Sequence, residues 1–117
     1  MNAQPVIDAM TFAELKTTVG ADFIGELIDA YLDDTPRLIN DLAESLAQQD
    51  ASKFGRTAHS IKSSSASLGA LPLSLLAKEL EMMGKQGNLN EAEPKVKQLQ
   101  ESYYQVQHKL EELRDES

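Results

Sequence analysis

Residues 91–113, EAEPKVKQLQESYYQVQHKLEEL, decide the fold. Their apolar side chains recur at steps of four and three, which is the spacing of one face of an α-helix; they are Ala92, Val96, Leu99, Tyr103, Val106, Leu110 and Leu113. Charged and amide side chains occupy most of the remaining positions. The pattern predicts a long amphipathic helix that packs in a helical bundle, beginning near Asn88 or Asn90 with Pro94 in its first turn.

Two helical blocks precede this one in the first half of the chain. Thr11 and Glu14 have the spacing of a capping box, which predicts a short helix from Thr11 to Val19 that ends at Gly20. A long block over about 22–48 carries an apolar stripe that includes Phe23 and Leu27. Because proline removes one backbone hydrogen bond, Pro36 is expected to kink this helix or to split it.

Two further blocks lie between residues 50 and 87. A helix is expected over 52–68, with Asp50 or Ser52 as its cap and Gly69 after its end. Pro72 suits the first turn of the next helix, and Gly84 and Gly87 are expected to end it. The charged tail, residues 111–117, is expected to fray.

Short loops between these blocks make consecutive helices antiparallel neighbours. We therefore predict an all-α protein, an antiparallel up-down-up-down four-helix bundle with a short additional N-terminal helix. Residues 1–117 are expected to form a single domain, with the bundle core over about 11–113.

Composition excludes several classes of protein. The 117 residues include no cysteine, which excludes disulfides, thiolate zinc sites and iron–sulfur clusters. The formal net charge of −8 disfavours nucleic-acid binding, which needs a cationic surface. No stretch approaches the ~20 apolar residues of a membrane span, and no signal peptide is evident. We expect a soluble, cytoplasmic monomer that binds neither nucleic acid nor membrane.

The charge is unevenly distributed along the chain. Residues 51–77 contain no Asp or Glu but include Lys53, Arg56 and Lys62, so this segment carries +3 and the remainder carries −11. A local cationic patch on an acidic protein indicates that an anion binds there.

His59 lies in this segment. At ~100° per residue it projects to the outer surface of its helix, roughly 140° from Phe54 on the core face. Its neighbours on that surface are mostly small, namely Ser52, Gly55, Ser63 and Ala66, together with Arg56. Small residues of low helix propensity are explained if another protein's active site must approach the ring closely.

A neutral imidazole is a competent nucleophile at pH 7. A phosphoryl group on its outer nitrogen would need a cation, which Lys62 can supply from the next turn of the helix. The other ring nitrogen would need an acceptor, and Glu81 is the candidate, although it is equally explained as an interfacial surface carboxylate. An exposed histidine without a function is the alternative for His59.

The stretch from His59 to Ala70, HSIKSSSASLGA, resembles the phosphoacceptor motif of histidine-containing phosphotransfer (HPt) domains, the carriers of multistep phosphorelays. The Asp-Thr-Pro segment at 34–36, the glycine ten residues after the histidine and the Leu-Glu-Met-Met-Gly sequence at 80–84 extend the similarity over nearly the whole chain.

The resemblance implies that His59 accepts a phosphoryl group from a receiver-domain aspartate or a histidine kinase and passes it to a response regulator. The protein would then be a phosphocarrier with no cofactor of its own, and the receiver would supply magnesium and most of the catalysis. Lys62 matches the family's phosphate-neutralising lysine, and Glu81 falls where these domains often carry a glutamine that hydrogen-bonds the ring. Ser63 departs from the family's usual glycine and places a hydroxyl in the approach path.

Two questions stay open at this level. The apolar residues Phe12, Leu15, Phe23 and Leu27 belong either to the core or to an exposed docking patch beside His59. The alternative function is a non-catalytic helical adaptor that binds and regulates a kinase or receiver domain.

His108 lacks comparable neighbours and is expected to be inert, and no nucleotide-binding motif is present.

Overall fold

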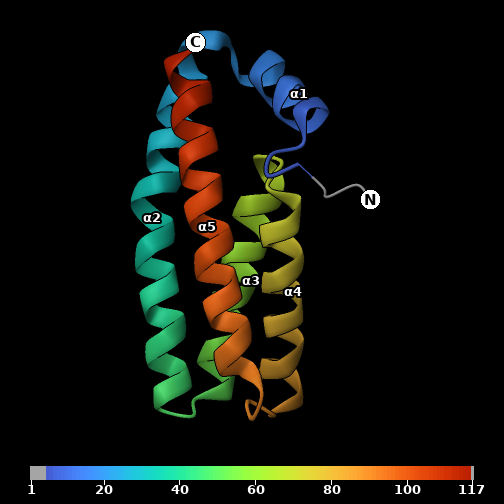
Figure 1. The fold of residues 1–117 in the computed structure, drawn as a ribbon, viewed down its shortest axis with the longest axis vertical. Coiled ribbons are helices and arrows are strands. Elements are labelled where there is room, and N and C mark those ends of the chain that lie inside the picture. Colours follow the sequence, from blue (N-terminus) through green and yellow to red (C-terminus); the bar gives the residue numbers. More distant parts are fainter. Residues whose placement is uncertain (1–4, 117) are drawn as a thin grey trace.

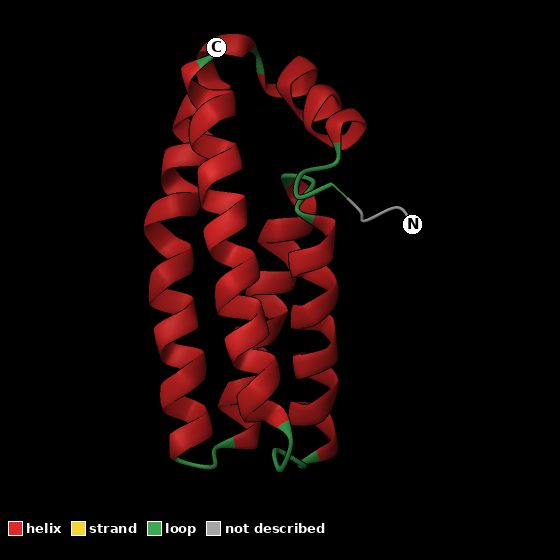
Figure 2. Cartoon of the chain, in the orientation of Figure 1, coloured by secondary structure: helices red, strands yellow, loops and turns green. Residues whose placement is uncertain are grey.

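The computed structural model describes residues 5–116, and all regular structure in that range is helical. Within residues 5–116, five helices follow one another, separated by short loops (Figure 2). They are α1 (Ala9–Val19), α2 (Ala21–Ala47), α3 (Ala51–Ser67), α4 (Leu71–Gln86) and α5 (Ala92–Asp115). The predicted all-α fold is confirmed.

Helices α2 to α5 run alternately up and down and form the bundle, as Figure 1 shows. Helix α3 packs against α2 and α4, while α5 packs against α4 and α2, so the four helices form a closed ring. The short α1 lies across the end of the bundle where α2 begins and α5 ends (Figure 1). Among the described residues, no helix is long and apolar enough to cross a membrane.

The core runs along the axis of the bundle and takes one face from each helix. Apolar positions spaced by three and four are buried, because those steps keep side chains on one face. The predicted seam of α5 is buried in this core from Ala92 to Leu110, and Leu113 is partly buried. The largest apolar side chains that are almost wholly buried are Phe54, Ile24, Ile28, Leu42, Ile61, Leu73, Leu80, Leu99, Leu110 and Val106.

The polar pair of Tyr31 and Ser65 is also buried, with 2.7 Å between the two hydroxyl oxygens. Ser65 therefore faces the core, as its place in the helical pattern predicts. Burial raises the pKa of Tyr31 to about 12, although the hydrogen bond with Ser65 acts in the opposite direction.

The predicted N-terminal capping box is wrong. Helix α1 begins at Ala9, and its cap is Asp8, whose carboxylate accepts a hydrogen bond from the backbone N–H of Thr11 at 2.9 Å. The Thr11 hydroxyl donates to the same oxygen at 2.6 Å, and these bonds lower the pKa of Asp8. Aspartate is a stronger cap than threonine, so the helix starts earlier. The helix ends at Gly20 as expected.

The long second helix is not split at Pro36. Helix α2 continues through this residue from Ala21 to Ala47, with Pro36 on its exposed side. Proline removes only one backbone hydrogen bond, and Ile28 and Ile39 are buried in the same core on either side of it. Burial of the apolar side chains before and after Pro36 keeps the two halves of α2 in one continuous helix.

The ends of the last two helices also differ from expectation. Gly84 lies inside α4, which ends at Gly87, where the left-handed φ of 70° suits glycine. Helix α5 begins at Ala92, so neither Asn88 nor Asn90 caps it.

The charged tail does not fray where it is described. Helix α5 continues to Asp115, and Arg114 Nη1 lies 2.6 Å from Asp29 Oδ1 of α2. This ion pair raises the pKa of Arg114 and ties the last turn to the bundle. Ser117 lies outside the described residues.

Candidate functional site

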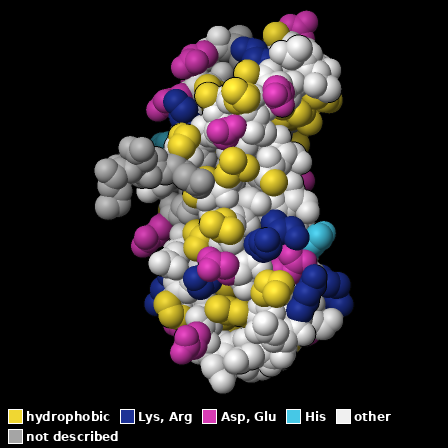
Figure 3. Space-filling view, turned by 90° about the vertical axis from the view of Figure 1, so that its right-hand side faces the viewer, with side chains coloured by type: hydrophobic (Ala, Val, Ile, Leu, Met, Phe, Trp, Pro, Cys, Tyr) yellow, Lys and Arg dark blue, Asp and Glu magenta, His cyan; other side chains and the backbone are white. Residues whose placement is uncertain are grey.

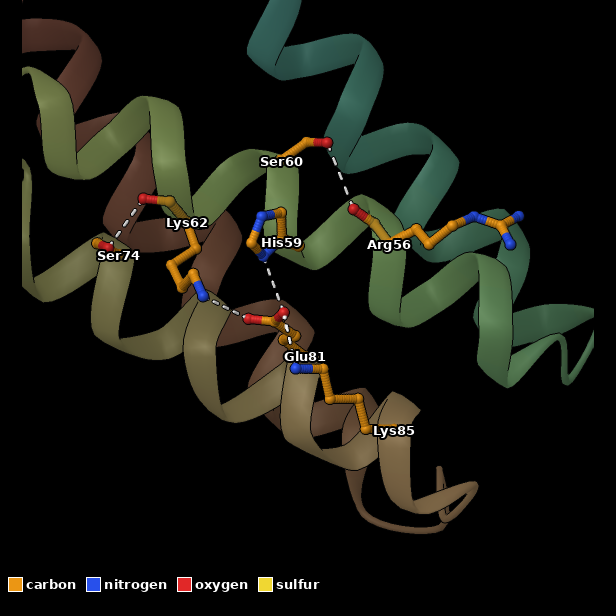
Figure 4. Close-up of polar contacts among 7 residues, drawn as sticks. All are labelled: Arg56, His59, Ser60, Lys62, Ser74, Glu81 and Lys85. Carbon is orange, nitrogen blue, oxygen red and sulfur yellow. Dashed lines mark hydrogen bonds and ion pairs between the residues drawn. The ribbon is translucent and has the colours of Figure 1, made fainter.

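His59 stands on the outer face of α3, where its side chain is 56% exposed. Its Nδ1 atom lies 2.8 Å from Oε2 of Glu81, which reaches across from α4 (Figure 4). The predicted pairing of these two residues is therefore present. Nε2 points away from Glu81 in Figure 4 and has no hydrogen-bond partner among residues 5–116.

Glu81 is the centre of the site and is only 5% exposed. Lys62 of α3 donates to its Oε1 at 2.7 Å, and Lys85, one turn along α4, approaches Oε2 at 3.4 Å. A buried carboxylate needs such partners, since leaving its charge unpaired would be costly. The alternative that Glu81 is a surface carboxylate is wrong.

The partners of Glu81 set its ionisation. The hydrogen bond from Lys62 lowers the pKa of Glu81 most, the bond to His59 and the charges of Lys62 and Lys85 add to this, and together they outweigh burial. The resulting pKa is about 2, so Glu81 is ionised at neutral pH.

An ionised carboxylate can only accept hydrogen bonds, which decides the tautomer of His59. In the neutral ring the proton must lie on Nδ1 to be donated to Glu81, so the lone pair lies on Nε2. That lone pair faces solvent. The arrangement is an exposed nitrogen nucleophile whose second nitrogen is held by a buried acceptor.

A groove of about 760 Å³ runs beside His59 between α3 and α4. Arg56 and Lys85 contribute positive charge to its lining, and Ser52 and Ser60 contribute hydroxyls. Figure 3 shows a histidine side chain (cyan) next to several Lys or Arg side chains (dark blue) and one Asp or Glu side chain (magenta). Of the three cations in the predicted patch, Lys62 contacts Glu81 and Arg56 lines this groove, whereas Lys53 lies 3.9 Å from Glu44 of α2, so the patch is present only in part.

The sequence pattern placed Gly55 on the exposed surface beside His59 and did not point to Lys85 as a site residue. Gly55 is buried with its backbone against Gly84 of α4, so it faces the neighbouring helix and does not line the surface that a partner would approach. Lys85 could have been found from its position four residues after Glu81, because side chains at that spacing on a helix form ion pairs.

The other predicted neighbours of His59 lie on the accessible side of α3. Arg56 is exposed and donates to Ser52 Oγ at 3.0 Å. Ser63 is exposed and Ala66 is partly buried. Their part in the close approach of a partner stays a prediction.

The four candidates for the docking patch divide between core and surface. Phe12 is buried in the core, because α1 turns its apolar side onto the bundle end, so its assignment to an exposed patch is wrong. Leu15 and Leu27 line a second groove of about 440 Å³ between α1, α2 and α3, which Ser60 and Ser64 also border. Phe23 is 47% exposed.

His108, the second histidine, is exposed on α5. No hydrogen bond or ion pair to its ring is formed within the described part of the chain. Residues 5–116 hold no group of three or more His, Cys, Asp or Glu side chains that could bind a metal ion.

Two known proteins that are similar to this chain are both histidine-containing phosphotransfer proteins. The chain is 29% identical over 102 residues to histidine-containing phosphotransfer protein 1 from Arabidopsis thaliana, covering 86% of this chain and 66% of that protein. Its fold matches the crystal structure of histidine-containing phosphotransfer protein B (HptB) from Pseudomonas aeruginosa with a TM-score of 0.92 and 28% identity, covering 98% of this chain and 99% of the other.

The family model for the Hpt domain matches residues 26–116. That range includes His59, Lys62, Glu81 and Lys85, and it leaves α1 and the first residues of α2 outside. With the site, the fold and more than half of the sequence in agreement, the chain belongs to the Hpt domain family.

Proposed function

We propose that this protein is an intermediate of a two-component phosphorelay. His59 accepts a phosphoryl group from the aspartate of a receiver domain, or from a histidine kinase, and passes it to the aspartate of a response regulator. One observation carries the proposal: Glu81 holds Nδ1 of an exposed histidine and leaves Nε2 free to react.

The transfer is a displacement at phosphorus. The lone pair of Nε2 forms the new N–P bond, the P–O bond of the aspartyl phosphate breaks, and its electron pair stays on the aspartate carboxylate. The reverse sequence returns the phosphoryl group to an aspartate. Both directions need the two reacting groups held in line, which docking of the receiver provides.

Lys62 and Lys85 place positive charge on the Glu81 carboxylate that holds the ring, and Arg56 lines the same groove with its guanidinium turned toward Ser52. A phosphoryl group on Nε2 brings negative charge to this surface, and we assign Lys62 to its neutralisation. Lys62 is bound to Glu81 in the unphosphorylated protein, which holds its ammonium group close to the histidine.

The protein acts as a phosphocarrier and needs no cofactor of its own, while the receiver domain supplies magnesium and most of the catalysis. Its partners are response-regulator receiver domains and a sensor or hybrid histidine kinase. We place the protein in the cytoplasm as a monomer that exposes one face of α3 to each partner in turn.

Docking is assigned to the surface beside His59 on α3 and to the groove formed with α1 and α2. Ser63 and Ala66 allow close approach on α3, while Leu15, Leu27 and the exposed Phe23 supply apolar area. Burial of such a modest apolar patch suits a transient complex.

The test follows labelled phosphate from a phosphorylated receiver to this protein. The wild type should gain an acid-labile, alkali-stable label. The variant His59→Gln should gain none while keeping its helical circular dichroism and its unfolding midpoint. His108→Gln, the matched control on α5, should be labelled at the wild-type rate, and normal labelling of His59→Gln would overturn the assignment.

A further inference from the structure

We propose that Arg56 and Ser63 form a binding site on α3 for the phosphoryl group that His59 carries on Nε2. The guanidinium group of Arg56 holds two of the phosphoryl oxygens, and the hydroxyl group of Ser63 donates a hydrogen bond to the third. This inference rests on the proposed function for the origin of the phosphoryl group. It adds a site for that group which is separate from the residues that hold Nδ1.

The place of this site follows from the direction of the histidine ring. Oε2 of Glu81 lies 2.8 Å from Nδ1, and Nε2 points away from Glu81 (Figure 4). Lys62 and Lys85 both contact the Glu81 carboxylate, at 2.7 and 3.4 Å, so their ammonium groups are held on the Nδ1 side of the ring. A phosphoryl group on Nε2 therefore projects away from these two cations.

Arg56 and Ser63 lie on the other side of His59 around the helix. At ~100° per residue, both project within about 60° of His59 in one direction, whereas Lys62 projects about 60° in the opposite direction. Arg56 precedes the histidine by three residues and Ser63 follows it by four. At these spacings the Cβ atoms of a helix lie about 5–6 Å apart, so the two side chains flank the ring from the preceding and the following turn.

Arg56 pairs with no carboxylate within residues 5–116. The chain has three arginines, and Arg37 and Arg114 each form an ion pair with an aspartate. Arg56 is exposed, and its guanidinium group donates to the neutral hydroxyl of Ser52 at 3.0 Å. In a protein with a net charge of −8, an exposed arginine without an acidic partner is placed to bind an anion from outside the chain.

The hydroxyl group of Ser63 is also without a partner in the described part of the chain. The hydroxyls of Ser60, Ser64 and Ser67 on the same helix donate to backbone carbonyls one turn earlier. Ser63 is exposed, and its Oγ atom forms no hydrogen bond within residues 5–116. Its hydroxyl is therefore free to donate to a ligand, which the glycine usual at this position in the family cannot do.

Arg56 reaches the phosphoryl group by a rotation of its side chain. In Figure 4 this side chain extends along α3 away from His59, toward the turn that carries Ser52. Turning back to His59 gives up one hydrogen bond to a neutral hydroxyl and gains charge-assisted bonds to an anion, which are stronger. The planar fork of a guanidinium group matches two phosphoryl oxygens, whereas a lysine ammonium group binds as a point charge.

The carboxylates that neighbouring helices bring toward this surface are already paired. From α4, Glu81 is compensated by the two lysines that contact it. From α2, Asp34 lines the adjacent groove and is compensated by Arg37. Arg56 is thus left for the phosphoryl oxygens, while Lys62 acts on the added charge through space.

The experiment labels His59 with phosphoramidate, which needs no receiver, in a His108→Gln background where His59 is the only histidine. Phosphorus-31 NMR follows the phosphoryl group from about pH 5 to 9 and gives the pKa of its last proton. Nitrogen-15 NMR of the arginine Nε–H groups, before and after labelling, reports whether Arg56 changes its partner.

Two variants remove the proposed donors, and each has a matched control on α3. Arg56→Gln is compared with Lys53→Gln, which removes a positive charge one turn earlier. Ser63→Ala is compared with Ser67→Ala, which removes an exposed hydroxyl one turn later. Arg56→Lys keeps the charge without the planar fork.

Arg56→Gln should raise the pKa of the phosphoryl group by about one pH unit, as expected for loss of an adjacent opposite charge. Ser63→Ala should raise it by less, because only a neutral donor is lost, and Arg56→Lys should lie between Arg56→Gln and the parent. Both controls should titrate like the parent. The Nε–H signal of Arg56 should shift when the parent is labelled, while those of Arg37 and Arg114 stay in place.

Equal titrations of Arg56→Gln and Lys53→Gln, or an Arg56 signal that does not move on labelling, would exclude Arg56 from the site. Equal titrations of Ser63→Ala and Ser67→Ala would exclude Ser63. If the variants behave as expected but no receiver exchanges phosphate with His59, the proposed function fails and the phosphoryl site stands. Normal exchange with unaltered titrations keeps the proposed function and rejects the site.

Discussion

Gly55 of α3 and Gly84 of α4 meet backbone to backbone. A Cβ atom on Gly84 would lie 2.6 Å from the Cα atom of Gly55 and 2.9 Å from the carbonyl oxygen of Ala51. This close approach lies about one helical turn from the site on each helix, at His59 on α3 and Glu81 on α4. The two glycines bring the two helices close enough for these side chains to share a hydrogen bond.

Gly84→Ala should therefore damage both stability and the site. The added methyl group meets backbone atoms that cannot rotate away, so α4 must shift, and we expect a loss of about 1–3 kcal/mol. Gly55→Ala is the control, because its Cβ would meet no atom nearer than 3.5 Å, an ordinary contact. Urea unfolding of both variants measures the difference, and equal stability would show that the helices are not held at this contact.

Lys62→Ala should slow phosphotransfer and shorten the life of the phosphorylated form. One charge-assisted hydrogen bond near the ring is lost, and because it is partly solvated we expect a change of about tenfold. Lys53→Ala is the matched control on the same helix, since the ammonium group of Lys53 lies 3.9 Å from the exposed Glu44 and forms no other ion pair within residues 5–116. Rates and half-lives for Lys62→Ala that match the control would exclude a role for Lys62 in neutralising the phosphate.

Glu81 should also govern stability in acid. Its pKa is lowered in the folded protein from 4.5 to about 2, so its stabilisation is fully present above the unfolded value and is lost as the pH falls through the folded value. Between about pH 5 and pH 2, the unfolding free energy of the wild type should fall more than that of Glu81→Gln, by on the order of 2 kcal/mol. Denaturant titrations at a series of pH values measure this, with Glu79→Gln following the wild type.

The docking surface is tested at Phe23. Phe23→Ala should lower the second-order rate of transfer from a phosphorylated receiver severalfold, because apolar area at the interface is lost. Its effect on stability should be small, since the ring is already half exposed. Leu75→Ala, which removes a similarly exposed apolar side chain from α4, should leave the rate unchanged. If Leu75→Ala lowers the transfer rate and Phe23→Ala does not, the interface lies on α4.

Local patterns of the sequence predicted the helices because they depend on neighbours within a few residues. The seam of α5, Pro72 in the first turn of α4 and the glycines at 20 and 87 follow from helical periodicity and backbone freedom alone. The error at Thr11 came from competition with Asp8, a nearby and stronger cap. Helix α5 begins two residues after Asn90 without a side-chain cap. Helix α2 is not split at Pro36, because burial along α2 outweighs one lost hydrogen bond.

The sequence by itself also determined that His59 is exposed on a cationic helix, since the rotation of a residue around its own helix is fixed by 3.6 residues per turn. Only the tertiary structure decided that Phe12 is buried, that Gly55 belongs to a helix contact and that Glu81 is a buried carboxylate holding Nδ1. His59 and Glu81 are separated by 22 residues in the chain. Their distance depends on how closely and at what rotation α3 and α4 pack, which is set by the side chains of both helices together and not by either segment alone.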